Sequence, residues 1–193
     1  MARSRAPIPK GHDVDRSDSH LEIVGRVVKT LTDAGFEPIL VGGMALVILG
    51  SQRVTRDFDF VIAHPRERLE TVVDVVYEHG LELVSRLNDV GEVTATIANR
   101  RVAVNRIRLD RPASVHFCNP KTRLRIDLLF DFPVPAATLA EHATRTKVRS
   151  YFVRVASEAD LLQLKKIAHA KRAAPGDAQD IAFLEARAPS DSP

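Results

Sequence analysis

The stretch that decides the fold reads Val41-Gly-Gly-Met-Ala-Leu-Val-Ile-Leu-Gly50, followed by Ser51-Gln-Arg-Val-Thr-Arg-Asp57-Phe-Asp-Phe60. A short buried strand over 38–41 ends at Gly42-Gly43, and a short apolar helix over 44–49 follows. Two glycines let the backbone turn sharply and let a phosphate approach the backbone amides closely, at the positive end of the next helix. Taken alone, the glycine pair is better explained as a simple tight turn.

The next strand, 57–62, alternates acidic and aromatic residues before it ends in Val61-Ile62. Residues two apart in a strand point to the same face, so Asp57 and Asp59 lie side by side, and Phe58 and Phe60 face the core. Adjacent like charges are unfavourable unless a cation or a donor compensates them. Two solvent-facing acids on an edge strand are the alternative, but the apolar end of the strand favours a central position and a Mg²⁺ site.

A third acid, Asp127, stands inside the apolar run Leu124-Arg-Ile-Asp-Leu-Leu-Phe130, which is typical of a buried strand. A buried carboxylate has to be paired or bind a metal. The alternative to a metal is an ion pair with Arg125, two positions away on the same face. Asp131 is a weaker candidate because it stands at the end of the strand, close to Pro133.

The rest of the chain predicts an α+β fold, a mixed β-sheet flanked by helices with a small helical C-terminal segment. Ser157 and Asp160 form an acidic version of a capping box at the start of that segment. The expected domains are a tail over 1–17, a catalytic domain over 18–156, the helical segment over 157–187 and a second tail over 188–193. Besides the elements above, helices are expected from about 17–19 to 35 and over 65–80, 136–142, 157–168 and 177–186, and strands over 93–97, 102–107, 115–117, 124–130 and 151–155.

Composition narrows the class of protein. The chain has 193 residues, 45% of them hydrophobic, and a single cysteine, Cys118, so it can bury a core but cannot form an intramolecular disulfide. No apolar run is long enough to cross a membrane, and Met1–Lys10 is not followed by the apolar stretch of a secretory signal. A soluble cytoplasmic protein is therefore expected. The histidines lack zinc-site spacing, and no P-loop motif is present.

Positive charge is concentrated between residues 100 and 125. The net charge of +3 is too small to indicate a nucleic-acid partner by itself. The basic stretch favours slightly a solvated hairpin whose long side chains protect a sheet edge, over a surface that holds phosphates or RNA. It contains Arg100, Arg101, Arg106, Arg108, Arg111, Lys121, Arg123 and Arg125.

Taken together, the glycine pair, the Asp57-x-Asp59 strand and the later Asp127 resemble the DNA polymerase β-type nucleotidyltransferase superfamily. Within it, the stretch from Val41 to Asp59 looks like the AbiEii/AbiGii-type toxins. The tail is similar to the helical Lys … Asp-x-x-Asp segment of that group. Its matching parts are Ser157-Glu-Ala-Asp-Leu-Leu-Gln-Leu-Lys165 and Asp177-Ala-Gln-Asp180. The chain is shorter than the larger toxins, which have a more extended C-terminal domain.

The resemblance implies a two-metal mechanism. Asp57, Asp59 and Asp127 would be the catalytic residues and would hold two Mg²⁺ ions. The NTP substrate would be bound by five residues, Gly42, Gly43, Arg53, Thr55 and Lys165. For Lys165 an ordinary exposed helical lysine is an equal alternative. For Asp177 and Asp180 we expect structural roles, as a helix-start acid and in an ion pair with Arg172 or Lys166.

The family also implies an activity, the transfer of NMP from an NTP to a macromolecular acceptor, tRNA or protein. The protein would then be the toxin of a toxin–antitoxin pair, with an antitoxin protein as a partner. Two alternatives stay open from the sequence. One is a non-catalytic module of the same fold that binds RNA or a partner, and the other is a nucleotidyltransferase that modifies an antibiotic or a metabolite.

Overall fold

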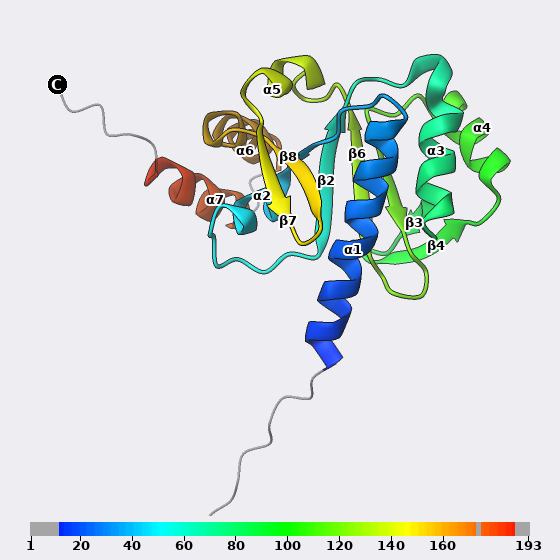
Figure 1. Ribbon diagram of the computed structural model, residues 1–193, viewed down its shortest axis with the longest axis horizontal. Helices are drawn as coiled ribbons and strands as arrows, with labels where there is room; N and C mark the ends of the chain where they lie inside the picture. The colour runs from blue at the N-terminus through cyan, green and yellow to red at the C-terminus, as the bar shows by residue number, and fades with distance from the viewer. Residues whose placement is uncertain (1–11, 173–174, 188–193) are drawn as a thin grey trace, which may run out of the picture.

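The computed structural model describes residues 12–172 and 175–187, which form one mixed sheet with helices on both faces (Figure 1). The strands are β1 (Ile39–Val41), β2 (Asp57–Ile62), β3 (Glu82–Leu87), β4 (Val93–Ile97), β5 (Ser114–Cys118), β6 (Arg125–Phe130), β7 (Thr144–Val148) and β8 (Tyr151–Val155). The helices are α1 (His12–Asp33), α2 (Gly42–Ile48), the 3₁₀ helix η1 (Arg66–Arg68), α3 (Leu69–Glu78), α4 (Arg100–Asp110), α5 (Ala136–His142), α6 (Glu158–Arg172) and α7 (Pro175–Glu185).

The sheet has the strand order β4-β3-β5-β6-β2-β1-β8-β7. Strand β2 pairs in parallel with β6, β1 pairs in parallel with β8, and the other neighbours are antiparallel. Strand β2, which carries the two predicted acids, is therefore central, with β1 on one side and β6 on the other. The alternative of an edge strand is excluded by this order.

The main hydrophobic core lies between the sheet and the helices α1, α3 and α4. Phe58 and Phe60 are buried in it, as the alternation in β2 predicts, and their partners in β6 are Ile126 and Leu128. On the other face of β2 the acidic residues lie toward α2 and α6. Helix α6 packs against both α2 and α7 there, so the two faces of β2 have different neighbours (Figure 1).

Most of the predicted elements are confirmed, including the mixed sheet, the strand–glycine–helix–strand unit over 38–62 and the helical C-terminal segment. The expected strand over 102–107 is wrong, because these residues belong to α4. Asn99 caps this helix by accepting a hydrogen bond from the amide of Val102. Ala103, Val104 and Ile107 are its buried residues, and this spacing is helical although the residues are largely branched.

Three further features differ from the sequence prediction or extend it. Helix α1 begins at His12, earlier than the start near 17–19 that the sequence indicates. Strand β7, 144–148, is not predicted, because only one of its residues has a bulky apolar side chain; it forms an edge hairpin with β8. The predicted tails fall mainly on 1–11 and 188–193, which lie outside the described residues.

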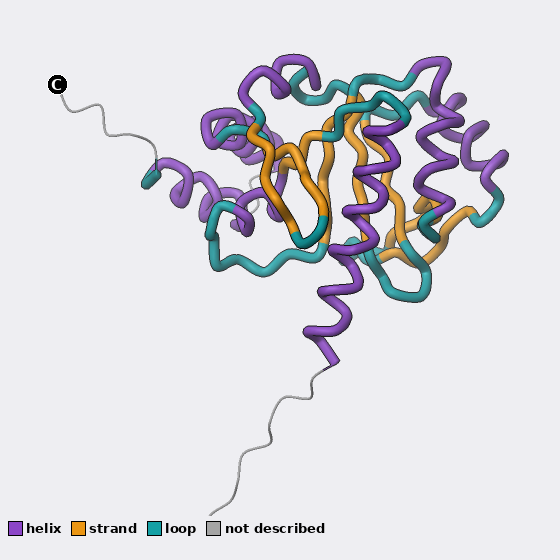
Figure 2. Tube along the Cα trace, in the orientation of Figure 1, coloured by secondary structure: helices purple, strands orange, loops and turns teal. Residues whose placement is uncertain are grey.

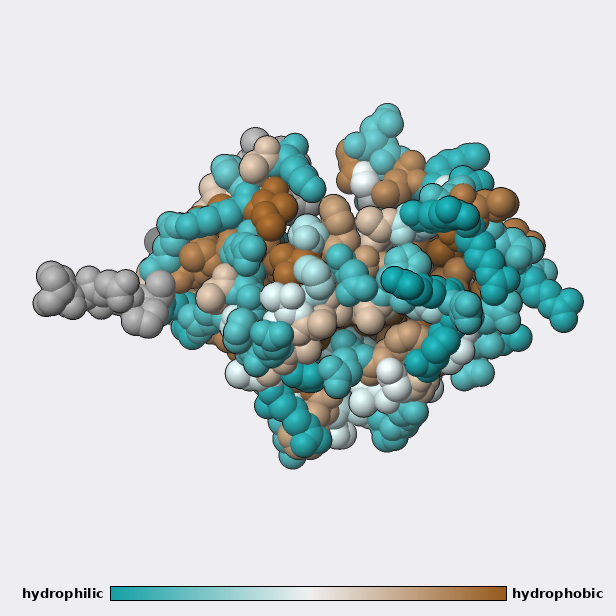
Figure 3. All heavy atoms as spheres, turned by 90° about the horizontal axis from the view of Figure 1, so that it is seen from above, coloured by the Kyte–Doolittle hydropathy of each residue, from teal (hydrophilic) through white to brown (hydrophobic). Residues whose placement is uncertain are grey.

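The fold divides the basic stretch: residues 100–110 form α4, and only Lys121, Arg123 and Arg125 lie on the hairpin formed by β5 and β6. Three arginines of α4 pair with acids on the helix-covered side, in the pairs Arg100–Asp74, Arg106–Asp110 and Arg108–Glu70. Arg125 instead lies on the face that carries the predicted acids. Seen from above (Figure 3), hydrophilic side chains cover much of the surface between smaller hydrophobic patches. Among the described residues, no helix is both long and apolar enough to span a membrane.

Candidate active site

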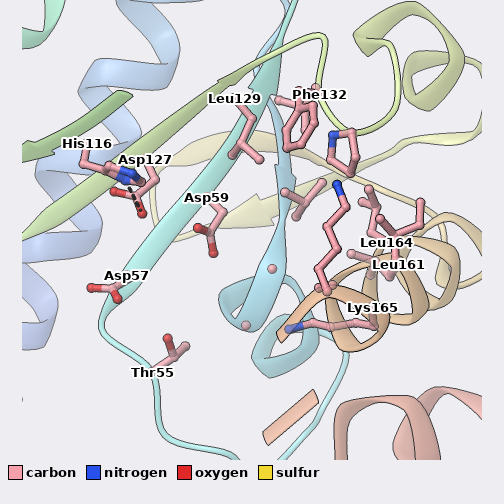
Figure 4. Close-up of a pocket in the computed structure, with 18 of the residues that line it drawn as sticks. Thr55, Asp57, Asp59, His116, Asp127, Leu129, Phe132, Leu161, Leu164 and Lys165 are labelled. Atoms are coloured by element: carbon pink, nitrogen blue, oxygen red, sulfur yellow. Dashed lines mark ion pairs between the residues drawn. The ribbon is translucent and has the colours of Figure 1, made fainter. Parts of the chain in front are cut away.

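One cavity of about 620 Å³ is lined by every residue that the sequence predicts for the site (Figure 4). It lies between the acidic face of β2 and β6 and the helices α2 and α6. The predicted residues in its lining are Gly42, Gly43, Arg53, Thr55, Asp57, Asp59, Asp127 and Lys165. The far wall, from α6 and the 132–133 segment, is mostly apolar and includes Phe132, Leu161 and Leu164.

Strand pairing brings the three acids to the same face of the sheet. Asp59 lies directly opposite Asp127 in the parallel β2–β6 pair, and Asp57 lies opposite Arg125. Directly opposed residues point to the same side of a sheet. In the antiparallel β1–β2 pair, Val41 lies opposite Asp59, so the chain turns into Gly42 beside this carboxylate. The three acids and the glycine pair therefore belong to one site.

Burial and mutual repulsion make the charged forms of these carboxylates unfavourable. Burial and the nearby charges of Asp127 and Asp57 raise the pKa of Asp59 to about 6, against the smaller opposing effect of Lys165. Burial also raises the pKa of Asp57, and Arg125 opposes that shift. Ionisation of such a cluster is unfavourable without a cation. The site therefore has negative charge that is not fully compensated, and a bound divalent cation would neutralise it.

Because the pKa of Asp59 is raised, Asp59→Asn is expected to stabilise the protein at pH 7 in the presence of a chelator. The folded protein holds a proton on Asp59 up to a pKa of about 6, whereas the unfolded chain releases it near 4. Stability therefore falls as pH rises through this window and stays low above it. One pKa unit corresponds to about 1.4 kcal/mol, so the gain at pH 7 is on the order of 2 to 3 kcal/mol.

Urea unfolding at pH 4 and pH 7 measures the effect. The gain should fall below about 1 kcal/mol near pH 4, where the folded wild type is protonated at this position and the unfolded chain is about half protonated. A variant that is less stable than wild type at pH 7 would contradict the prediction.

Gly42 is required by close packing against Asp59. Its φ is +67°, and a Cβ atom at this position would lie 2.0 Å from Oδ2 of Asp59. Only glycine fits both the left-handed backbone and this contact. At Gly43 a Cβ atom would lie 2.9 Å from Cζ of Arg53, so the second glycine makes room for the arginine. The tight-turn explanation is therefore incomplete, because both glycines also adjoin residues of the cavity.

Gly42→Ala is expected to cost about 2 kcal/mol from the left-handed backbone and to displace the Asp59 carboxylate. A displacement of about 1 Å in such a site lowers activity about a hundredfold. Gly50→Ala is the matched control, because Gly50 has φ +98° and nothing within 4 Å of its added Cβ. Both variants should lose stability in urea unfolding because of their left-handed backbone, Gly42→Ala more so because of the overlap with Asp59, and only Gly42→Ala should lose activity. Equal activity of the two would contradict the role of the contact with Asp59.

Four charged side chains form a network between α6, α7 and the loop before β2. Nζ of Lys165 lies 2.6 Å from Oδ2 of Asp180 and 3.6 Å from Oδ1 of Asp177, and Arg53 pairs with Asp180 as well. Lys165, Asp177 and Asp180 are buried. Lys165 is thus not an exposed helical lysine. Asp180 was expected to pair with Lys166 or Arg172. The expectation is wrong for Lys166, because Lys166 pairs with Glu185.

Arg53 and Thr55 lie on the long loop over 49–56, which joins α2 to β2 without regular structure (Figure 2). Arg53 is drawn toward α7 by its pair with Asp180, and its guanidinium packs over Gly43. Thr55 is half-buried at the edge of the cavity, close to the start of β2. The loop therefore connects the glycine pair to the acids through residues that face the same space.

Two cavity residues, His116 and Arg125, approach the acids, and the sequence did not assign them to the site. Nδ1 of His116 lies 2.9 Å from Oδ2 of Asp127, although the contact lacks the angle of a regular hydrogen bond. Arg125 lies 3.7 Å from both Asp57 and Asp127, so the predicted Arg125 pair exists but is long. The contact with Asp127 raises the pKa of His116, and burial opposes this shift. Only the pairing of β5 with β6 places His116 opposite Asp127.

Asp131 has a structural role, as its position at the end of β6 suggests. Its carboxylate accepts hydrogen bonds from the amides of His64 and Ala136, and it thereby fixes the turn into α5. Ser157 likewise caps α6 by accepting a hydrogen bond from the amide of Asp160, which confirms the predicted serine cap, and the Ser157 hydroxyl donates to Oδ2 of Asp160. Neither residue lines the cavity.

The chemistry of the donors fits a divalent cation, but the side chains are not arranged around one. Within the described part of the chain, no three His, Cys, Asp or Glu side chains stand close enough to bind a common metal ion. Oδ1 of Asp127 is buried and has no hydrogen-bond partner among the described residues. A buried carboxylate oxygen of this kind, next to two more acids of raised pKa, is suited to a hard cation such as Mg²⁺.

Several solved structures share this fold at low sequence identity. The antibiotic-resistance factor ANT(2'')-Ia is 10% identical, with a TM-score of 0.55 over 88% of this chain and 84% of its own. An antigenic nucleotidyltransferase-like protein from Paracoccidioides brasiliensis is 14% identical, with a TM-score of 0.55 over 87% and 76%. The lincosamide antibiotic adenylyltransferase LnuA is 11% identical, with a TM-score of 0.52 over 85% and 95%. These likenesses establish the nucleotidyltransferase fold.

The sequence itself matches a family model. No curated protein matches the chain. The model described as "Nucleotidyl transferase AbiEii toxin, Type IV TA system" matches residues 29–193, a range that includes all eight predicted site residues. The protein therefore belongs to the AbiEii family of nucleotidyltransferases.

Proposed function

We propose that the protein transfers an NMP group from a Mg²⁺-bound NTP to a macromolecular acceptor, tRNA or protein, as the toxin of a toxin–antitoxin pair. The observation that carries the proposal is the single cavity in which Asp57, Asp59 and Asp127 face a glycine pair and a buried lysine. The family description names a toxin, which favours a cellular macromolecule over an antibiotic as the acceptor. An antitoxin protein is the partner that this role requires.

The proposed reaction is an in-line substitution at the α-phosphorus. A hydroxyl oxygen of the acceptor forms a bond to this phosphorus, and the bond from the phosphorus to the oxygen bridging the α- and β-phosphates breaks. Pyrophosphate leaves with that electron pair, and the hydroxyl proton passes to Asp127. When bound, two Mg²⁺ ions would neutralise charge on the entering and leaving oxygens. Asp57, Asp59 and Asp127 are the residues that would hold them.

The other cavity residues are assigned to the triphosphate. The amides of Gly42 and Gly43 would approach its oxygens, because neither residue has a side chain in the way. Lys165 and Arg53 supply positive charge on the same side, and the acids of α7 keep both cations in place. Thr55 would brace the loop beside the phosphates. Binding of the triphosphate would then compete with Asp180 for the lysine.

Pyrophosphate release tests the proposal. The purified protein is given each NTP in turn, labelled at the α-phosphate, with Mg²⁺ and either total tRNA, a protein extract, or an aminoglycoside or lincosamide antibiotic. We expect release with one NTP, dependent on Mg²⁺, with the label recovered in RNA or protein. Label on the antibiotic would instead support the small-molecule alternative. RNA binding that needs neither Mg²⁺ nor NTP, without pyrophosphate release, would support the non-catalytic module.

A further inference from the structure

The two oxygens of Asp127 have different surroundings. Oδ2 lies 2.9 Å from Nδ1 of His116 and 3.7 Å from Nη2 of Arg125. Oδ1 is buried and has no hydrogen-bond partner within the described residues. One oxygen therefore faces two cationic or donor groups, and Figure 4 shows its pair with His116, while the other oxygen has no hydrogen-bond partner among the described residues.

The fold holds His116 in place for this contact. His116 lies on β5, directly opposite Asp127 of β6, and directly opposed side chains of an antiparallel pair share one face. The flanking residues of β5, Val115 and Phe117, are buried in the core on the opposite face, so the strand cannot rotate. Within the described part of the chain, Asp127 is the only acid with which His116 forms an ion pair. The imidazole itself is partly exposed and lines the cavity.

We propose that His116 is a positioning residue for Asp127. By holding Oδ2, it restricts the rotation of the carboxylate and leaves Oδ1 as the oxygen that binds the cation beside Asp59. Groups that orient a metal-binding carboxylate in this way commonly change metal affinity by about 10- to 100-fold. His116 would not touch the triphosphate, because Lys165, Arg53 and the glycines stand on the other side of Asp59 from β5. This inference rests on the proposed function, in which Asp127 holds Mg²⁺.

Three substitutions of His116 separate the effect of a nitrogen at the Nδ1 position from the effect of the size of the ring. His116→Asn places a side-chain nitrogen near the position of Nδ1, His116→Gln places one near the position of Nε2, and His116→Phe keeps a ring without a donor. Ser114→Ala is the matched control, since Ser114 lies on the same face of β5, two residues away and opposite Leu129. Circular dichroism and urea unfolding show which variants fold.

Mg²⁺ affinity is measured by calorimetric titration without NTP, and kcat and KM are measured for the folded variants. We expect His116→Phe and His116→Gln to weaken Mg²⁺ binding about tenfold or more and to lower kcat, with KM for the NTP unchanged. His116→Asn and Ser114→Ala should stay within about threefold of wild type, in line with a retained donor at the Nδ1 position.

Three results would overturn the inference in distinguishable ways. Equal Mg²⁺ affinity of wild type, His116→Phe and Ser114→Ala would show that His116 does not position Asp127, while the proposed function would stand. Failure of the wild type to bind Mg²⁺ at all would overturn both. Equal rescue by His116→Asn and His116→Gln would reject the contact through Nδ1.

Discussion

Asp59→Asn is expected to lower the rate of pyrophosphate release by about a thousandfold or more. Asp59 is the central acid of the site, opposite Asp127 on β6, two residues from Asp57 and in contact range of Gly42. Charge stabilisation by a bound metal is worth several kcal/mol in the transition state, and each 1.4 kcal/mol corresponds to about a factor of ten in rate. An asparagine keeps the shape of the side chain but removes the charge that holds the cation. Asp57→Asn should have the same effect.

The stability gain predicted for Asp59→Asn separates a loss of activity from a loss of folding. Asp59→Asn should be inactive and yet more stable than wild type in a chelator at pH 7, so unfolding cannot explain the loss. Mg²⁺ should raise the melting temperature of the wild type and leave that of the variant unchanged. Asp89→Asn, in the exposed turn between β3 and β4, is the control for the loss of one negative charge. Residual activity above a tenth of wild type would mean that the metal is held elsewhere.

Asp180→Ala is expected to reduce the free energy of unfolding by about 3 to 5 kcal/mol, the usual cost of breaking a buried ion pair by removing one partner. The side chain of Lys165 is only 9% exposed, and that of Asp180 only 4%. Without Asp180, the acidic partner left to the ammonium group among the described residues would be Asp177, at 3.6 Å. Arg53 would lose its acidic partner as well. Urea unfolding followed by circular dichroism measures the change.

A neighbouring pair on the same two helices provides the control. Lys166 and Glu185 are 2.9 Å apart and about half exposed, so Lys166→Ala should cost less than about 1 kcal/mol. The double variant Lys165→Met/Asp180→Leu should recover only part of the stability, because apolar residues replace the Lys165–Asp180 pair at little cost but Arg53 still loses Asp180 and the buried Asp177 still loses Lys165. It should not recover pyrophosphate release, since the lysine is gone. Equal losses for Asp180→Ala and Lys166→Ala would contradict the importance of burial.

The acids on one face of the sheet could be predicted because they depend on short-range periodicity. The alternation in β2 fixes the side of Asp57 and Asp59, and the apolar run around Asp127 marks a second buried strand. Gly42 could be placed because its left-handed backbone lies directly between a strand and a helix. The family resemblance added Lys165, which the helical pattern alone would have left as a surface residue.

Other features depend on pairing between distant segments and could not be predicted. His116 enters the site only through the register of β5 against β6, for which the sequence has no local signal. The partners of Asp180 come from the 49–56 loop and from α6, and local spacing favoured Lys166 instead. The strand expected over 102–107 failed because branched residues suit both a strand and a buried helix face. In this case the capping Asn99 was the better indicator.

Helix α6 supplies much of one wall of the cavity, and the acids of α7 fix its lysine, although both helices come after the whole sheet in the chain. The ribosome makes the three carboxylates before it makes residues 158–185, so a chain interrupted before residue 158 has the acids but not the lysine. Completion of the cavity therefore depends on the last helices to be synthesised.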